Sequence, residues 1–557
     1  MTSTPLTALC DRYWIALLAR APIVATRLGD RRFEAQLAAI DADSRAAVMA
    51  ELQEFLSGLA ALDRSAFTED ESTTAAILEL QVRRALGERE HGLELLAVNQ
   101  MYGPQVSFLQ LGPVHPMDAA GRETYVTRLA AFPQYIDDYL DLLREGLAAG
   151  VIGPRLVIDR VDRQLIDLLA VPTEKSPLLV AADRVDEADR DAYRARILDA
   201  VNTHVLPSYE RFHAFLRDTY LPRATETIGL AALPGGAEAY AHRIWYHTTL
   251  RRTAQEIHDQ GLELMDVLET RMREISNRAG HGDDLSAYNA ALRSDPANTY
   301  ATGDDVIAHA TELLERATTL LPRYFGRLPR TVCKTREIED FRAKDAPAGY
   351  YQGAPGDASR PAHYVVNTSR PQERMRSNMP ALSLHEAVPG HHLQISLARE
   401  SGTLHRFRRS ASITSFVEGW ALYTERLGQE MGFYDDDRTL YGMLTYQAWR
   451  ASRLVVDTGM HAFGWSRERA VDYLREHVAI AESEIQNEID RYILWPGQAL
   501  AYMVGCEHIS DLRHGTEAVL GDAFDLPAFH DELLRHGAVP LGLLSELMAD
   551  WTERQSA

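Results

Sequence analysis

Hydrophobic residues recur at intervals of three and four along most of the chain, the spacing at which side chains share one face of an α-helix. The clearest case is residues 304–321, where Asp304 or Asp305 would be the N-cap and the apolar positions are Val306, Ile307, Ala310, Leu313, Leu314, Ala317, Leu320 and Leu321. The same pattern predicts helices at about residues 35–60, 72–97, 118–149, 185–219, 254–277, 410–431 and 466–495. Segments containing glycine or proline separate them as loops at residues 148–154, 232–237 and 278–284. We therefore expect a mainly α-helical protein.

One segment departs from this pattern. Residues 345–369 contain closely spaced glycine and proline, followed by a short β-like run from His363 to Asn367. This predicts a long loop that leads into an isolated strand or a hairpin. The segment precedes the richest motif of the chain, so it is either a binding loop beside a catalytic helix or a surface excursion between two helices.

We expect the chain to be organised in two regions. Helices of an N-terminal region, residues 1–300, would form the walls of a deep cleft. The C-terminal region, residues 301–557, would contain the small β-element and the candidate chemistry.

Composition and charge exclude several classes of protein. Of 557 residues, 46% are hydrophobic and 25% are charged, which is typical of a globular protein with a sizeable core. The formal net charge of −22 repels phosphate backbones and anionic lipids, so we expect neither a nucleic-acid nor a membrane partner. The first residues lack the basic opening of a signal peptide, and the three cysteines, Cys10, Cys333 and Cys506, are far apart. These features predict a cytoplasmic protein without a disulfide framework.

The sequence ALSLHEAVPGHHLQISL, residues 381–397, carries the first part of a candidate metal site. In zinc hydrolases, an HExxH motif on a helix places two imidazoles one turn apart, and the glutamate beside the first histidine faces the attacking water. His385 and Glu386 fit this pattern, but Pro389 stands where the second histidine belongs.

Pro389 and Gly390 explain physically how a second histidine could still reach the site although position 389 is not histidine. Proline cannot donate to the carbonyl of His385, and glycine adds backbone freedom, so the helix is expected to break here. A bulge of two extra residues would bring His391 to the position one turn after His385. His392 is the rival ligand, because on an unbroken helix it returns to the face of His385.

A zinc site with two histidines needs a third protein ligand and an open position. The segment at residues 412–428 offers Glu418, whose neighbours are Phe416, Val417, Trp420 and Leu422. A carboxylate among apolar side chains is costly unless it is paired or bound to a cation. Glu425 is a weaker candidate that would support a ligand. We therefore expect Zn²⁺ as the cofactor, held by His385, Glu418 and one of the two rival histidines.

HEAVPGHHLQ followed by SFVEGWALYTERLG resembles the bacterial family catalogued as domain of unknown function 885. That family is similar to the helical gluzincin peptidases, namely the thimet oligopeptidase and carboxypeptidase Taq groups. In the oligopeptidases the glutamate of a Phe-Val-Glu sequence is the third zinc ligand, which implies this role for Glu418. The resemblance extends to residues 353–368, 457–470 and 488–505 and loosely spans most of the chain.

The chemistry expected of this site is hydrolysis of an amide bond. Zinc lowers the pKa of water from about 16 to about 7 and polarises a carbonyl. Glu386 would accept a proton from the attacking water and deliver it to the leaving amine. A developing oxyanion needs a further donor. The candidates are His461, Tyr492 and Tyr502, which lie in the segments that resemble the family, and the residues do not decide among them.

Substrate binding is less determined by the sequence. The strand at residues 362–368 could pair with an extended peptide by edge addition, with Tyr364 and Asn367 near the bound chain. A substrate carboxylate could pair with a guanidinium, for which the candidates are Arg450, Arg453 and Arg491. In the competing interpretation, Asp457 or Glu488 neutralises these arginines.

The function that we expect is a zinc-dependent hydrolase of amide bonds in short peptides or amino-acyl conjugates. One alternative is an enzyme that acts on a non-peptide amide in specialised metabolism. The other is a non-catalytic helical binding protein with a degenerate metal site, which the departure at Pro389 keeps open.

Overall fold

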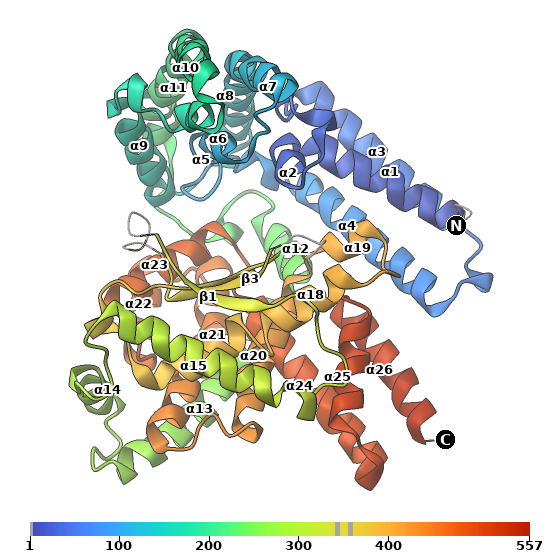
Figure 1. The fold of residues 1–557 in the computed structure, drawn as a ribbon, viewed down its shortest axis with the longest axis vertical. Helices are drawn as coiled ribbons and strands as arrows, with labels where there is room; N and C mark the ends of the chain where they lie inside the picture. Colours follow the sequence, from blue (N-terminus) through green and yellow to red (C-terminus); the bar gives the residue numbers. More distant parts are fainter. Residues whose placement is uncertain (1–3, 340–342, 344–345, 355–359, 557) are drawn as a thin grey trace. The chain divides into compact units, whose positions relative to one another are not determined.

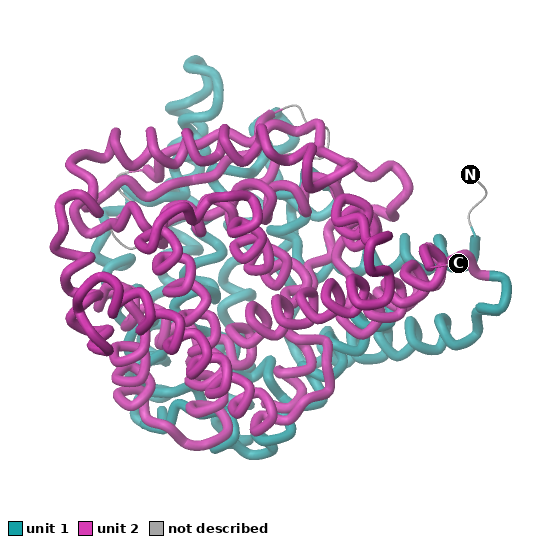
Figure 2. The backbone as a smooth tube through the Cα atoms, turned by 90° about the horizontal axis from the view of Figure 1, so that it is seen from below, with its two compact units in different colours: residues 1–66, 78–239 teal, residues 67–77, 240–557 magenta. Residues whose placement is uncertain are grey.

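A computed structural model describes residues 4–339, 343, 346–354 and 360–556. Helices account for most of these residues, and the described strands form one three-stranded sheet (Figure 1), which confirms the mainly α-helical fold. The chain divides into two compact units, residues 1–66 with 78–239 and residues 67–77 with 240–557 (Figure 2). Residue 300, where we expected the two regions to meet, lies inside the second unit.

The first unit is helical. Its helices are α1 (Pro5–Arg20), α2 (Pro22–Arg27), α3 (Ala42–Ala60), α5 (Pro104–Ser107), α6 (Leu111–Val114), α7 (Ala119–Ala130), α8 (Phe132–Ala149), α9 (Arg155–Ala170), α10 (Glu187–Ala200) and α11 (Leu206–Phe215). Two further helices, α4 (Glu69–Glu90) and α12 (Gly236–Thr248), contribute to both units.

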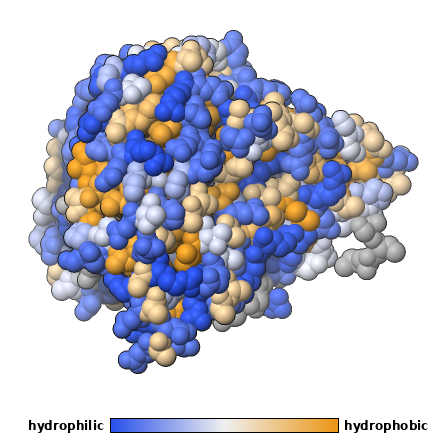
Figure 3. All heavy atoms as spheres, turned by 90° about the horizontal axis from the view of Figure 1, so that it is seen from above, coloured by the Kyte–Doolittle hydropathy of each residue, from blue (hydrophilic) through white to orange (hydrophobic). Residues whose placement is uncertain are grey.

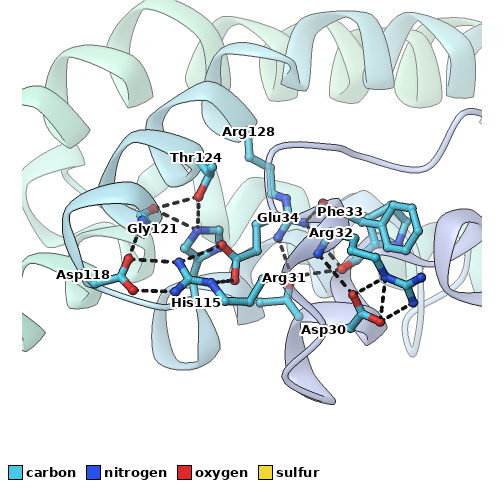
Figure 4. Close-up of polar contacts among 12 residues, drawn as sticks. Asp30, Arg31, Arg32, Phe33, Glu34, His115, Asp118, Gly121, Thr124 and Arg128 are labelled. Carbon is cyan, nitrogen blue, oxygen red and sulfur yellow. Dashed lines mark hydrogen bonds and ion pairs between the residues drawn. The ribbon is translucent and has the colours of Figure 1, made fainter.

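A buried arginine lies among polar contacts of the first unit (Figure 4). Arg128 of α7 is fully buried and donates to the backbone carbonyls of Phe33 (2.7 Å) and Gln36 (2.8 Å). Nearby, Arg31 donates to Asp118 (2.9 Å), whose side chain caps the start of α7. These bonds join α7 to the segment at residues 31–36, so we assign this cluster a structural role.

The second unit holds the sheet and the remaining helices. The strands are β1 (Cys333–Glu337), β2 (Gly349–Gln352) and β3 (Ala362–Val366). The helices are α13 (Ala254–Arg278), α14 (Leu285–Ser294), α15 (Gly303–Leu320), α17 (Met379–Glu386), α18 (His391–Glu400), α19 (Arg406–Ser410), α20 (Thr414–Glu430), α21 (Asp437–His461), α22 (Arg467–His477), α23 (Glu482–Leu494), α24 (Leu500–Leu520), α25 (Leu526–Arg535) and α26 (Leu541–Ser556).

Helices α20 and α24 cross at very short range. A Cβ atom on Gly419 would lie 2.5 Å from the backbone of Gly505, and one on Gly505 would lie 1.9 Å from the carbonyl oxygen of Ser415. Only glycine permits this approach. The crossing fixes the position of α20 next to Glu418, while α21, buried along most of its length, packs against α13, α17 and α24.

The sheet differs from the expected isolated strand or hairpin. Its order is β1-β3-β2, with β3 parallel to β1 and antiparallel to β2. Because β3 is the central strand, both of its edges are already paired, and the prediction that it accepts a peptide by edge addition is wrong. Residues 345 and 355–359 of the predicted β-element lie outside the described residues.

Several helix boundaries also differ from the periodicity. The N-cap of α15 is Thr302, not Asp304 or Asp305, because Thr302 and Asp305 form a reciprocal capping box. The predicted helix at residues 466–495 is two helices, α22 and α23, and the one at residues 118–149 is also two, α7 and α8. Pro133 in the first turn of α8 lacks the amide hydrogen that would continue α7.

The face of the molecule in Figure 3 is mainly hydrophilic, with hydrophobic residues in separate groups between polar ones. Among the described helices, none is both long enough and apolar enough to span a bilayer.

Candidate metal centre

The helix that carries the histidines is interrupted where Pro389 and Gly390 predict a break. Between α17 and α18, the Gly390 amide donates to the Leu384 carbonyl (2.9 Å), and the His392 amide donates to the Ala387 carbonyl (3.0 Å). The first bond spans six residues instead of four, which accommodates two extra residues. A Cβ atom on Gly390 would lie 2.0 Å from the His385 carbonyl oxygen, so this tight return requires glycine.

Helix α20 holds the interruption in place. The Trp420 indole donates to the Pro389 carbonyl (2.9 Å), and the Thr424 hydroxyl donates to the Leu384 carbonyl (3.2 Å). Side chains of the helix that also carries Glu418 thus give the Pro389 carbonyl a donor and the Leu384 carbonyl a second one.

The break brings His385, His391 and Glu418 together. One potential ligand atom from each lies within 4.8 Å of the other two, and both histidines are buried. Glu418 Oε2 is 3.6 Å from His385 Nε2 and 3.4 Å from His391 Nε2. The imidazole rings are nearly perpendicular, with centroids 4.8 Å apart.

Glu425, one heptad after Glu418, contacts the opposite side of the His385 ring. The fully buried Glu425 carboxylate lies 2.8 Å from His385 Nδ1 and accepts a bond from Gln447 (3.3 Å). A carboxylate can only accept, so His385 donates from Nδ1, and in its neutral form the Nε2 lone pair faces Glu418. Two facing acceptors are unfavourable unless a proton or another cation lies between them.

The electrostatics of the cluster reflect this arrangement. Burial lowers the pKa of His385, but the carboxylates of Glu418 and Glu425 outweigh it and raise that pKa to about 9. Burial raises the pKa of Glu418, but the two imidazoles hold it well below its usual range. The donor set, two imidazoles and one carboxylate, therefore fits a divalent cation such as Zn²⁺.

Glu386 follows His385 directly at the end of α17. None of the described residues donates a hydrogen bond to its carboxylate, and the residue is only partly buried. Burial raises the pKa of Glu386, opposed by the charges of His385 and His391. A carboxylate with free lone pairs beside a candidate metal site is suitably placed to accept a proton.

His392 is directed away from the cluster. Its Nε2 lies 3.0 Å from the Thr331 carbonyl, and its Nδ1 lies 3.3 Å from the Tyr351 hydroxyl on β2. Burial lowers its pKa to about 4. Of the two rivals, the structure therefore brings only His391 to His385 and Glu418.

Tyr364 and Asn367 have structural partners. The Tyr364 side chain is fully buried beneath α17, where its hydroxyl accepts from Ser383 (3.4 Å). The Asn367 amide donates to backbone carbonyls that include Ala343 (2.8 Å), and its oxygen accepts from Ser369 (2.7 Å). These bonds occupy the groups that were expected to face a substrate.

The three candidate oxyanion donors lie in different surroundings. His461 Nε2 is 3.0 Å from the Tyr492 carbonyl, and burial lowers the pKa of His461 to about 4. The Tyr492 hydroxyl donates to Glu488 (2.6 Å). Burial raises the pKa of Tyr502, and the charge of Glu418 raises it further.

The three candidate arginines divide into two groups. Glu488 binds both Arg453 (3.0 Å) and Arg491 (2.8 Å), so it neutralises them as the competing interpretation proposed. Arg450 instead lies 3.8 Å from Glu425, with its guanidinium against the rings of Tyr446 (4.5 Å) and Trp449 (4.6 Å).

Asp457, the other proposed neutralising residue, does not bind these arginines. It accepts from the Tyr240 hydroxyl (2.6 Å) and from the Gly497 amide (3.0 Å). Burial raises its pKa to about 7.

Sequence reasoning missed the side chains of a neighbouring pocket. The space in this pocket is about 630 Å³ with the open solvent at its mouth included. The pocket is lined by Arg293, Ala348, Glu373, Arg374, Met375, Asn378, Met379, Leu382, Tyr446, Trp449, Ala479, Ile480, Ala481 and Glu484. These residues come from segments far apart in the chain, so no local spacing identifies them. We call it the α17–α21 pocket.

Fold and cluster together define a mainly α-helical protein in which two buried histidines and a partly buried glutamate form a group of potential metal ligands. The chain belongs to the family of bacterial proteins of unknown function DUF885, whose model matches residues 22–548. No curated protein matches the chain.

Two solved structures are similar to the whole chain. A candidate lipoprotein from Colwellia psychrerythraea has 25% identity and a TM-score of 0.91, and the match covers 99% of this chain and 100% of that one. A candidate lipoprotein of unknown function from Shewanella oneidensis has 17% identity and a TM-score of 0.78, with coverage of 98% and 99%. The second likeness concerns the fold alone.

Proposed function

We propose that the protein is a zinc-dependent hydrolase of amide bonds in short peptides or amino-acyl conjugates. The observation that supports this most strongly is the convergence of His385, His391 and Glu418, with ligand atoms within 4.8 Å of one another. Glu386 follows His385 directly, and none of the described residues donates a hydrogen bond to its carboxylate. Family membership supplies no activity, so the proposal rests on this geometry.

The separations within the cluster match the demands of zinc. Bonds of about 2.0–2.1 Å in a tetrahedron place neighbouring ligand atoms roughly 3.3 Å apart. The observed separations of 3.4 and 3.6 Å between Glu418 and the two imidazole nitrogens are close to this value. Three protein ligands leave a fourth position open, as in catalytic zinc sites.

Each nearby residue then has a distinct role. Bound zinc would supply a Lewis acid that lowers the pKa of water and polarises a carbonyl. Glu386 would accept the proton of the attacking water and pass it to the leaving amine. Glu425 would fix the tautomer and orientation of His385 through the 2.8 Å bond to Nδ1. Tyr502, whose hydroxyl is affected by the charge of Glu418, would donate to the developing oxyanion.

Metal analysis combined with a substrate panel tests the proposal. Protein purified without chelators should contain close to one zinc per chain and should hydrolyse members of a panel of dipeptides and N-acyl amino acids. Activity should disappear on chelation and return with added zinc. Failure to bind zinc on reconstitution would overturn the proposal, whereas zinc binding without turnover of any amide would favour the binding-protein alternative. Cleavage of N-acyl compounds alone would favour a non-peptide substrate.

A further inference from the structure

The α17–α21 pocket shares a helix face with the candidate general base. On α17, Met379 and Leu382 line the pocket, and Glu386 follows them at i+7 and i+4. Residues with this spacing lie on one face of a helix. The α17 wall of the pocket therefore leads to the Glu386 carboxylate.

The opposite wall also leads to the candidate metal centre. Tyr446 and Trp449 of α21 line the pocket, and the guanidinium of Arg450 packs against both rings. Arg450 lies 3.8 Å from Glu425, which in turn binds His385. A molecule in the pocket would thus extend towards the centre along two independent walls.

Arg374 is the unusual charge in this pocket. Its Nε donates to the Ser369 carbonyl (2.9 Å), and none of the described residues forms a hydrogen bond with its two terminal nitrogens. Glu373 is paired with Arg370 (3.3 Å), and Glu484 accepts from the Ala481 amide (3.3 Å). The terminal nitrogens of the half-buried Arg374 are therefore available to an anion in the pocket, although the carboxylates of Glu484 and Glu373 also act on its charge.

The remaining lining is suited to an apolar group. Met379, Leu382, Ala479 and Ile480 provide aliphatic surface, next to the rings of Tyr446 and Trp449. A guanidinium with two free nitrogens can bind a carboxylate through parallel hydrogen bonds. The pocket thus combines an apolar site with an anion receptor.

We propose that the α17–α21 pocket binds a terminal apolar amino-acid residue with a free carboxylate, which pairs with Arg374. This inference rests on the proposed function, which it deepens: the bond cleaved is the amide that precedes an apolar carboxyl-terminal residue. Peptides or acyl conjugates with a blocked carboxyl end would be poor substrates.

Binding measurements test the pocket separately from catalysis. The probes are N-acetyl-L-leucine and N-acetyl-L-leucinamide, titrated into the intact protein by calorimetry. We expect the acid to bind at least tenfold more tightly than the amide, because charged hydrogen bonds depend on the carboxylate. N-acetylglycine should bind about tenfold more weakly than N-acetyl-L-leucine, because it leaves the apolar surface uncovered.

Three variants assign the preference for the acid. Arg374→Gln should remove this preference. Arg374→Lys keeps the charge and should retain part of the preference, so it serves as the test if the glutamine variant does not fold. Arg293→Gln is the matched control, because this exposed arginine also lines the pocket. It should leave the preference intact.

The outcomes separate the two proposals. Equal binding of acid and amide by wild type, or a preference that survives Arg374→Gln, would overturn the pocket assignment. A preference lost in Arg293→Gln but kept in Arg374→Gln would overturn it as well. If the binding pattern is as expected but no amide is hydrolysed with zinc present, the pocket assignment stands and the proposed function fails.

Discussion

At the scale of single residues, the proposed site separates groups that hold a cation from one that moves a proton. His385, His391 and Glu418 face one another, whereas the Glu386 carboxylate accepts no hydrogen bond from the part of the chain that the structure describes. The cluster combines four acidic or basic groups within a short distance, so each substitution has a different expected consequence. Metal content and turnover must therefore be measured together.

Glu386→Gln should retain zinc and lose most turnover. The amide is nearly the same size but cannot accept a proton, so the rate should fall about 10²–10⁴-fold while metal content stays at the wild-type level. Single-turnover kinetics and elemental analysis on the same preparation measure both. Parallel loss of zinc and activity would make Glu386 a structural residue or a ligand.

The two adjacent histidines offer an internal control. His391→Ala removes a group that faces Glu418 at 3.4 Å, whereas His392→Ala removes bonds to Thr331 and Tyr351. Zinc affinity should fall strongly for the first variant and by less than tenfold for the second. Competition titration with a chromophoric chelator measures this. The reverse order of effects would make His392 the ligand.

At the scale of elements, local patterns predicted the helices and the break but not the contacts between segments. Pro389 and Gly390 indicated the interruption because the missing amide hydrogen of proline and the backbone freedom of glycine act on the neighbouring residues, whatever the rest of the fold. Strand β1, with the sequence CKTRE, has no apolar alternation and is defined only by its pairing with β3. Thr302 and Asp305 have the spacing of a capping box, but the apolar periodicity favoured Asp304 or Asp305 as the N-cap.

The site residues also divide into those that local sequence patterns indicate and those that only contacts between distant segments bring together. The spacing of His385, Glu386 and His391 is local, and the apolar neighbours of Glu418 marked it as a buried carboxylate. Arg374 and Tyr446 come together only through the packing of separate segments, which no spacing encodes. The choice of His391 over His392 likewise required the geometry of the break.

Gly390→Ala should disrupt the interruption. The new Cβ would overlap the carbonyl oxygens of His385 (2.0 Å) and Leu384 (2.4 Å), so the backbone must move. We expect a loss of about 3 kcal/mol in the free energy of unfolding together with weakened zinc binding. Gly402→Ala is the matched control, because its Cβ would meet no atom within 4 Å. Equal stability of the two variants in urea titration would contradict the close approach of Gly390 to the carbonyls of His385 and Leu384.

At the scale of the whole molecule, stability should depend on pH through Asp457. Its folded-state pKa is about 7, against roughly 4 when unfolded, so between these values only the folded state holds the proton. Raising the pH therefore favours unfolding, and wild type should lose roughly 3 kcal/mol between pH 5 and pH 8 through this group.

Asp457→Asn should abolish this contribution. One amide oxygen can still accept from Tyr240 and Gly497, and the buried charge is removed. Urea titrations of both proteins at pH 5 and pH 8 isolate the effect as a difference between them. An identical pH dependence in the two proteins would show that Asp457 is ionised in the folded state throughout this range.

The dependence of stability on metal connects the candidate centre to the fold. Ligands on α17, α18 and α20 belong to one compact unit, so a cation bound to them should stabilise the folded state by mass action. Glu418→Gln replaces a carboxylate ligand with a weaker neutral amide. Its melting temperature should fall below that of wild type when zinc is present, and the two melting temperatures should converge in chelator.

Glu425→Gln is the control, because it removes the partner of His385 Nδ1 but no ligand. It should reduce zinc affinity by about 10–100-fold and shift the zinc-loaded melting temperature less. A destabilisation by Glu418→Gln of the same size with zinc and with chelator would mean that Glu418 supports the packing of α20 and not a bound cation.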